Sequence, residues 1–319
     1  MNLIFCSYAY LDLYRSTVEN SIIKEEEKRK IDMYLKCCVV SLVSAKTKNS
    51  DCDVALITNI EVPEPYKTQF KSHGIMVIYK EYDSFRFGES MKWSLAFYKL
   101  CALKYAVENL DYERYLIVDS DTYFISKLND LWVEADQNVL LFDLSHSLSI
   151  KQNKTMNNEY YSLYNEKVLL TNYGGEFICG NLELLKIFID ECYSVYLDMQ
   201  EKNFITDHGD EFITGIVAYR KRTMIKNASP YIYRYWTGRF YLTSTNYIYN
   251  PVNILHVPTE KGVAFKYLYK YITRKGVLPQ NKRVFSLFGF PSAKRSLSKN
   301  TLLYMVNMFL LRQTKIFHK

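Results

Sequence analysis

Apolar and polar positions alternate along the first half of the chain with the periods of strands and of helices in turn. Short apolar runs bounded by polar residues predict strands at 3–8, 53–58, 75–79, 115–118 and 138–144. Apolar residues at helical spacing predict helices at about 18–45, 65–73 and 89–109. Strands that alternate with helices indicate an α/β fold, with a mostly parallel sheet and helices on both faces.

The second half of the chain has a less regular pattern. Residues 145–167 are polar and rich in asparagine, which predicts a long loop, either one that closes over a ligand or a disordered insertion. Residues 173–180 contain paired glycines and predict a short strand or turn. Helices are expected at 182–199 and at 207–219, the second with acidic residues in its first turn, as the helix dipole favours.

Charge divides the chain into two parts. Residues 1–260 hold 28 basic and 34 acidic side chains, a net charge of −6, whereas 261–319 hold 13 basic side chains and no acidic one. We therefore predict a catalytic domain at 1–262 and a basic, amphipathic, helical appendage at 263–319. The appendage has an apolar helical stripe (Phe265, Leu268, Tyr269, Ile272) and an apolar run at 302–311. Together with the basic side chains, these apolar residues predict that the appendage binds an anionic membrane surface. The rival interpretations are a packed terminal helix or oligomer contact, and a nucleic-acid site. The acidic remainder of the chain and the lack of a recognition motif argue against nucleic acid.

Cysteines and apolar runs bear on the compartment. The chain has seven cysteines, an odd number, without zinc-type spacing, which favours free buried thiols in a reducing environment. No basic leader precedes the first apolar run, and no run reaches the roughly 20 residues that span a bilayer. We expect a cytoplasmic protein, peripheral at the inner face of the membrane.

The most informative motif is Asp119-Ser120-Asp121, which follows the apolar strand predicted at 115–118. Side chains at i and i+2 of an extended chain point the same way, so both carboxylates face the ligand-binding edge of a parallel sheet. Oxygen ligands suit Mn²⁺ or Mg²⁺, and such an ion neutralises a diphosphate leaving group. We therefore predict a metal and diphosphate site at Asp119 and Asp121.

The segment 115–124 (YLIVDSDTYF) resembles the Asp-x-Asp segment of GT-A glycosyltransferases, particularly the retaining lipopolysaccharide galactosyltransferase and blood-group transferase types. The stretch 94–105 resembles the helix in those enzymes that carries a basic residue toward the donor, which implies a donor-binding role for Lys99. We also place Tyr8, at the end of the first predicted strand, at the donor.

Three later segments are similar to the same families in the expected order. The run from Tyr173 to Phe177 resembles the acceptor-side glycine motif, which implies that Gly174, Gly175 and Glu176 contact the acceptor, with the glycines allowing close approach of a sugar.

The second segment, 208–211, resembles the His-Asp-Glu stretch of the blood-group type and implies catalytic roles for Glu211 and Asp210. The third, 255–262, is similar to the galactosyltransferase segment in which a histidine binds the metal and a lysine holds the diphosphate. It implies His256 as a third metal ligand and Lys261 as a donor-binding residue. Residues 231–249 contain eight aromatics, and Trp236 among them is a candidate acceptor platform, although a β-hairpin with an aromatic core face is the simpler interpretation.

The resemblance implies a metal-dependent glycosyltransferase that moves a sugar from a UDP- or GDP-sugar to a glycan or lipid-linked acceptor, with retention, in surface polysaccharide or lipopolysaccharide-type biosynthesis. Two alternatives compete. A haloacid-dehalogenase-like phosphohydrolase also ends a strand in Asp-x-Asp, but it uses the first strand and a different residue at the position of Tyr123. A carbohydrate-binding scaffold with the same fold would retain no use for two adjacent carboxylates, which repel each other without a metal.

Overall fold

The computed structural model describes residues 1–10, 21–88, 91–145, 148–235, 252–289 and 306, with the backbone alone for 21–27. The strands are β1 (Asn2–Tyr8), β2 (Asp53–Thr58), β3 (Met76–Tyr79), β4 (Arg114–Val118), β5 (Thr122–Phe124), β6 (Val139–Asp143), β7 (Tyr173–Asn181), β8 (Ile225–Asn227), β9 (Ile232–Arg234) and β10 (Ile254–His256). The α-helices are α1 (Ser21–Lys48), α2 (Tyr66–Ser72), α3 (Tyr98–Asn109), α4 (Asn129–Ala135), α5 (Ile150–Tyr164), α6 (Leu182–Glu201), α7 (Asp210–Arg220), α8 (Ala264–Lys275) and α9 (Asn281–Leu287).

A seven-stranded sheet forms the centre of the molecule, in the order β3-β2-β1-β4-β7-β6-β8. Strands β3, β2, β1 and β4 are parallel to one another, and β8 is parallel to β6. Only β7 runs antiparallel to its neighbours β4 and β6. The predicted mostly parallel α/β sheet is confirmed, and the paired glycines belong to a nine-residue central strand.

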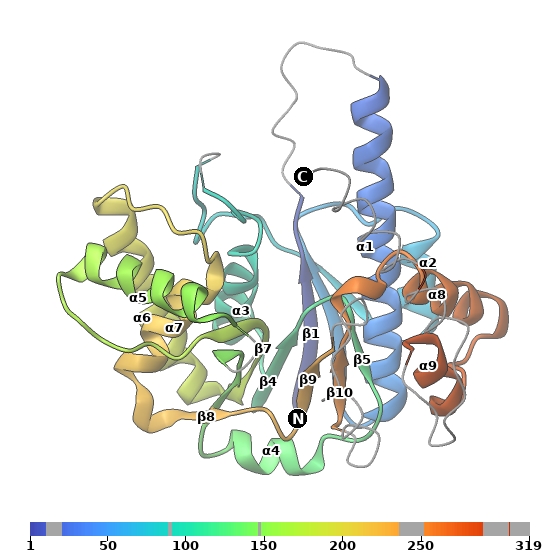
Figure 1. Cartoon of the computed structure of the whole chain (residues 1–319). Helices are drawn as coiled ribbons and strands as arrows, with labels where there is room; N and C mark the ends of the chain where they lie inside the picture. Colours follow the sequence, from blue (N-terminus) through green and yellow to red (C-terminus); the bar gives the residue numbers. More distant parts are fainter. Residues whose placement is uncertain (11–20, 89–90, 146–147, 236–251, 290–305, 307–319) are drawn as a thin grey trace.

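Helices cover both faces of this sheet (Figure 1). Along β1, Ile4 and Cys6 contribute to the core shared with α1 and α8, whereas Leu3 and Phe5 contribute to the core shared with α3, α6 and α7. This division follows from the alternation of side chains along a strand. Because the strand is apolar on both faces, it is buried in the middle of the sheet.

A second, three-stranded sheet in the order β5-β10-β9 lies beside the carboxyl end of β4. Strand β5 begins one residue after Asp121, and β10 pairs antiparallel with it, so that His256 is in register with Thr122. Strand β9 pairs parallel with β10, with Arg234 opposite His256. The small sheet therefore carries residues from far along the sequence to the edge where the Asp-x-Asp motif lies.

The prediction of a loop at 145–167 is wrong for most of that segment, because residues 150–164 form α5. Ser149 and Gln152 form a capping box at its N-terminus, and Met156, Tyr160 and Leu163 are buried along one face. The polar composition of the segment hides this narrow stripe. The helix predicted from residue 89 instead begins at Tyr98.

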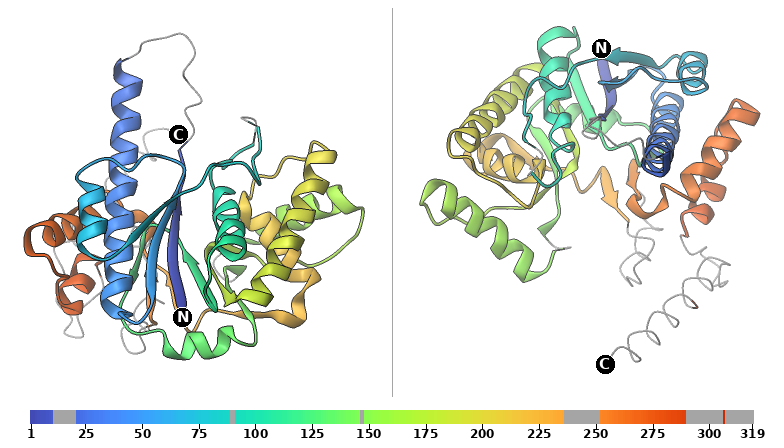
Figure 2. Two further views of the ribbon diagram at one scale, coloured as in Figure 1. Left: turned by 180° about the vertical axis from the view of Figure 1, so that it is seen from behind. Right: turned by 90° about the horizontal axis from the view of Figure 1, so that it is seen from above.

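The apolar stripe of 263–272 is not available to a membrane. Helix α8 packs beside α1 (Figure 2), and Phe265, Leu268 and Ile272 are fully buried. Tyr269 lies against Tyr66 of α2, with 5.6 Å between ring centroids. This part of the predicted appendage is therefore a packed helix. The apolar run at 302–311 lies, except for residue 306, outside the described residues.

Two further predictions concern single features of the sequence. All seven cysteines are buried and unpaired, as predicted. Among the residues that the structure describes, no helix combines the length and the apolarity that crossing a membrane requires.

Candidate active site

The Asp-x-Asp motif forms a fixed turn between β4 and β5. The Asp119 amide donates to the carbonyl of Glu176 on β7 (3.1 Å), and the carbonyl of Asp121 accepts from the Val257 amide (3.1 Å). The Thr122 hydroxyl lies 2.7 Å from the Ser41 hydroxyl of α1. Asp121 is 2% exposed, and the Asp119 side chain is 28% exposed. The turn therefore presents one buried and one accessible carboxylate.

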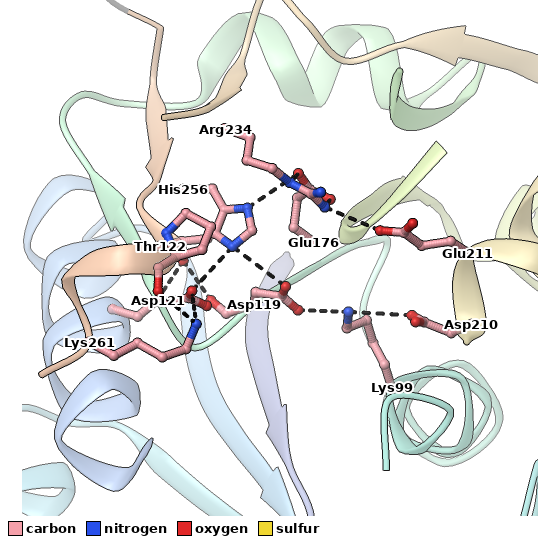
Figure 3. Close-up of polar contacts among 12 residues, drawn as sticks. Lys99, Asp119, Asp121, Thr122, Glu176, Asp210, Glu211, Arg234, His256 and Lys261 are labelled. Atoms are coloured by element: carbon pink, nitrogen blue, oxygen red, sulfur yellow. Dashed lines mark hydrogen bonds and ion pairs between the residues drawn. The ribbon is translucent and has the colours of Figure 1, made fainter. Parts of the chain in front are cut away.

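His256 faces both carboxylates (Figure 3). Its Nε2 lies 3.3 Å from Asp121 Oδ2 and 3.7 Å from Asp119 Oδ2, and its Nδ1 lies 3.2 Å from Glu176 Oε1. A carboxylate at Nδ1 holds the proton on that nitrogen and leaves Nε2 as the ligand atom, the usual arrangement around a metal-binding histidine. Glu176 therefore orients His256.

One ligand atom from each of Asp119, Asp121 and His256 lies within 4.8 Å of the others. Two carboxylates and an imidazole are a ligand set that Mn²⁺ accepts, and Mg²⁺ accepts the carboxylates. Asp119 and Asp121 lie in the turn between β4 and β5, whereas His256 lies on β10. Backbone hydrogen bonds hold the turn, and Glu176 holds His256 through Nδ1. The residues thus fit the metal site that the sequence predicted.

Two lysines flank the carboxylates. Lys261 forms an ion pair with Asp121 Oδ2, and Lys99 Nζ lies 2.7 Å from Asp119 Oδ1. Burial alone would raise the pKa of Asp121, but the neighbouring His256 and Lys261 lower it below its usual value. Both lysines therefore add positive charge at the two carboxylates. Their donor-binding role stays a prediction.

Arg234 was not identified from the sequence, although it is the centre of a second charged cluster. Its guanidinium binds both carboxylate oxygens of Glu176, with 2.6 Å from Nε to Oε1, and its Nη2 lies 3.3 Å from Glu211 Oε1. Glu176 is completely buried, and although burial raises its pKa, Arg234 and His256 lower it below the usual range. A lone arginine in the aromatic strand β9 was the signal available in the sequence.

Asp210 and Glu211 open α7 but have different surroundings. Asp210 is 5% exposed, and its Oδ2 lies 3.4 Å from Lys99 Nζ, so it is held in the Asp119–Lys99–Asp210 chain. The Glu211 side chain is 26% exposed and contacts Arg234. Burial raises the pKa of Glu211, Arg234 lowers it, and Glu176 and Asp210 raise it again, to about 7.

The acceptor-side residues predicted on β7 have other neighbours. A Cβ on Gly174 would overlap the Glu176 carboxylate, and a Cβ on Gly175 would overlap the Asp210 carboxylate. The same Cβ on Gly175 would lie 3.0 Å from Lys99 Nζ. The glycines make room for charged side chains of this protein, and the buried Glu176 contacts His256 and Arg234. The acceptor contacts expected at these three residues stay a prediction.

Tyr8 ends β1 and stacks on Tyr34 of α1, with 5.8 Å between ring centroids. Lys261 Nζ lies 5.9 Å from the centroid of Tyr34. Tyr8 thus belongs to an aromatic pair next to the Lys261–Asp121 ion pair, and its donor-binding role stays a prediction. Trp236, the predicted acceptor platform, lies outside the described residues.

Solved structures with a similar fold identify the architecture. No model of a protein family matches the sequence, and no curated protein matches it. The galactosyltransferase LgtC, in complex with donor and acceptor sugar analogs, has a TM-score of 0.54 and 13% identity, over 89% of this chain and 99% of that one. The chain has the GT-A glycosyltransferase fold. An active-site mutant of LgtC gives a TM-score of 0.52 at 12% identity.

A second enzyme of this fold type supports the same conclusion. Apo mouse xyloside xylosyltransferase 1 has a TM-score of 0.50 and 10% identity, over 82% of this chain and 99% of that one. The GT-A fold predicted from the Asp-x-Asp segment is thus confirmed over most of the chain.

Proposed function

We propose that this protein is a metal-dependent glycosyltransferase that takes a sugar from a nucleoside-diphosphate sugar and transfers it to a hydroxyl of a glycan or lipid-linked acceptor. The observation that carries the proposal is the convergence of Asp119, Asp121 and His256 at the carboxyl end of β4, in the GT-A fold. His256 is distant from Asp119 and Asp121 in the sequence, and the fold brings its imidazole to both carboxylates.

The donor site follows from the charges around this cluster. Asp119, Asp121 and His256 would hold a divalent ion, which when bound offsets charge on the diphosphate leaving group. Lys261 and Lys99 reach the two carboxylates from opposite sides (Figure 3) and are placed to contact phosphate oxygens when a donor binds. The lysines and the ion together would stabilise the negative charge that develops on the departing diphosphate.

Glu211 is the residue that we assign to the reacting sugar. Its side chain is partly exposed, and burial, Glu176 and Asp210 together raise its pKa to about 7, a value that suits a group that accepts a proton or stabilises developing positive charge. Asp210, which is paired with Lys99, serves in this proposal to position Lys99 against Asp119. The sequence assigned catalytic roles to both residues, and we now propose such a role for Glu211 alone.

Retention of anomeric configuration and a place in surface polysaccharide or lipopolysaccharide-type synthesis remain part of the proposal. The first is tested by the anomeric proton of the product in NMR. Attachment to the inner face of a membrane is supported by the exposed basic side chains of α8 and α9, among them Lys266, Lys270 and Arg274, and by the absence of acidic residues from 261 to 319.

Thermal denaturation tests the proposed function against a scaffold of the same fold. A transferase is expected to gain stability from UDP or GDP only when Mn²⁺ is present, because ligand binding to the native state raises the free energy of unfolding. A nucleotide shift that is equal with and without Mn²⁺, or no shift with either nucleotide, would contradict the proposal.

A further inference from the structure

An exposed tryptophan next to the candidate active site has an unusual backbone conformation. Trp93 has φ 63° and is 63% exposed. Bulky residues rarely adopt positive φ, and such strain persists where the surrounding structure fixes it, most often at functional sites. In the predicted helix at 89–109 this residue was a core position, so its exposure also contradicts the apolar pattern.

Contacts on both sides fix the backbone around Trp93. Its carbonyl accepts from the Ala96 amide at 2.8 Å, and the next carbonyl, of Ser94, accepts from the hydroxyl of buried Tyr82 at 2.6 Å. On the preceding side, Lys92 Nζ lies 3.5 Å from Asp207 Oδ1. The backbone is therefore held in place while the indole remains accessible.

The same residue touches the turn that carries the proposed catalytic carboxylate. A Cβ on Gly209, which itself has φ 59°, would lie 3.2 Å from Trp93 Cβ and 3.8 Å from its Cγ. Gly209 immediately precedes Asp210 and Glu211, and its positive φ together with the close Trp93 Cβ favours glycine at this point. The positive φ of both residues thus places an accessible aromatic side chain one residue from the start of α7.

We propose that Trp93 is a stacking platform for the acceptor sugar and so a specificity-determining residue, an inference that rests on the proposed function. A pyranose presents an apolar face of C–H groups, and an exposed indole covers such a face without requiring a particular hydrogen-bond pattern. This platform is proposed in addition to the acceptor contacts predicted on β7 and rests on no residue of 236–251.

The test compares Trp93→Gly with wild type in full-length protein. Glycine adopts positive φ without strain, so Trp93→Gly is expected to melt at the same or a higher temperature. Transfer is measured with Mn²⁺, UDP- and GDP-sugars as donors, and the methyl β-glycosides of glucose, galactose and N-acetylglucosamine as acceptors. The acceptor KM is expected to rise about tenfold, the effect of leaving about 50 Å² of apolar sugar surface uncovered, while the donor KM stays within about threefold. Trp93→Phe is expected to lose less, and Tyr161→Ala, which removes an exposed aromatic from α5, to lose nothing.

An unchanged acceptor KM in folded Trp93→Gly would overturn the platform. Loss of the proposed function has a different signature, because wild type would then release no nucleoside diphosphate from any donor, even to water. In that case NMR still tests the platform. The indole N–H signal that is missing from the spectrum of Trp93→Gly is the signal of Trp93. A shift of that signal on adding the methyl glycosides supports a sugar platform, and no shift contradicts it.

Discussion

Replacement of Glu176 by glutamine tests whether the buried carboxylate organises the metal site. Glutamine keeps the shape of the side chain but removes its charge. The neutral amide can no longer balance Arg234, and it no longer fixes His256 as a carboxylate does. We therefore expect Glu176→Gln to lower both the stability of the fold and the affinity for metal.

The magnitudes follow from the contacts. Breaking a buried ion pair from one side costs about 3–5 kcal/mol, and we expect about 3 kcal/mol here, because Arg234 keeps Glu211 at 3.3 Å. Loss of a group that orients a metal-binding histidine lowers affinity by about 10- to 100-fold, or about 1.4–2.7 kcal/mol. Because the folded-state pKa of Glu176 is lowered, its contribution to stability is complete above the ordinary glutamate range and shrinks as the pH falls below it.

The assay has two parts. Urea unfolding of metal-free protein at pH 7 measures the stability change, and electron paramagnetic resonance of free Mn²⁺ measures the affinity. Glu201→Gln, at the exposed end of α6, is the matched control and is expected to change neither quantity. If Glu176→Gln unfolds within about 0.5 kcal/mol of wild type and binds Mn²⁺ within about threefold, the assigned role is refuted.

Three further changes have defined outcomes. Because Glu211 becomes anionic as the pH rises through about 7, kcat of the wild type is expected to rise across that range. The kcat of Glu211→Gln is expected to be low and independent of pH. A kcat that rises with pH in the variant would contradict the catalytic role assigned to Glu211. Gly175→Ala puts a methyl group into the space of the buried ion pair between Lys99 of α3 and Asp210 of α7. It is expected to lower the free energy of unfolding in urea by about 1–3 kcal/mol. The control Gly88→Ala, with open space around it, is expected to change that free energy by less than about 0.5 kcal/mol. Lys266→Glu combined with Lys270→Glu is expected to reduce flotation of the full-length chain with anionic liposomes; equal flotation would exclude this face as the contact.

Much of the sheet and the metal cluster could be predicted from the sequence because their signals are local. Buried strands such as 53–58 are short apolar runs with polar ends, and their bounds agree with the structure. Asp119 and Asp121 lie next to each other at the end of such a strand, and the resemblance supplied His256, which the fold brings to them.

The other parts of the site depend on tertiary contacts, which a local sequence pattern does not reveal. Arg234 matters because β9 pairs with β10, and Glu176 turns inward because a buried guanidinium meets it. The glycines of β7 indicated a close approach, but the sequence does not tell whether a ligand or the protein's own side chains approach. Helix α5 was missed because its apolar stripe is narrow within a polar segment.

The most direct test of the central claim is the release of nucleoside diphosphate from a panel of UDP- and GDP-sugars, in the presence of the methyl glycosides. We expect release by wild type with Mn²⁺, none in excess chelator, and none by Asp121→Ala, whose fold should persist because the lost carboxylate is a ligand at the edge of the sheet. Release that survives both the chelator and Asp121→Ala would contradict a metal-dependent transferase centred on Asp119, Asp121 and His256.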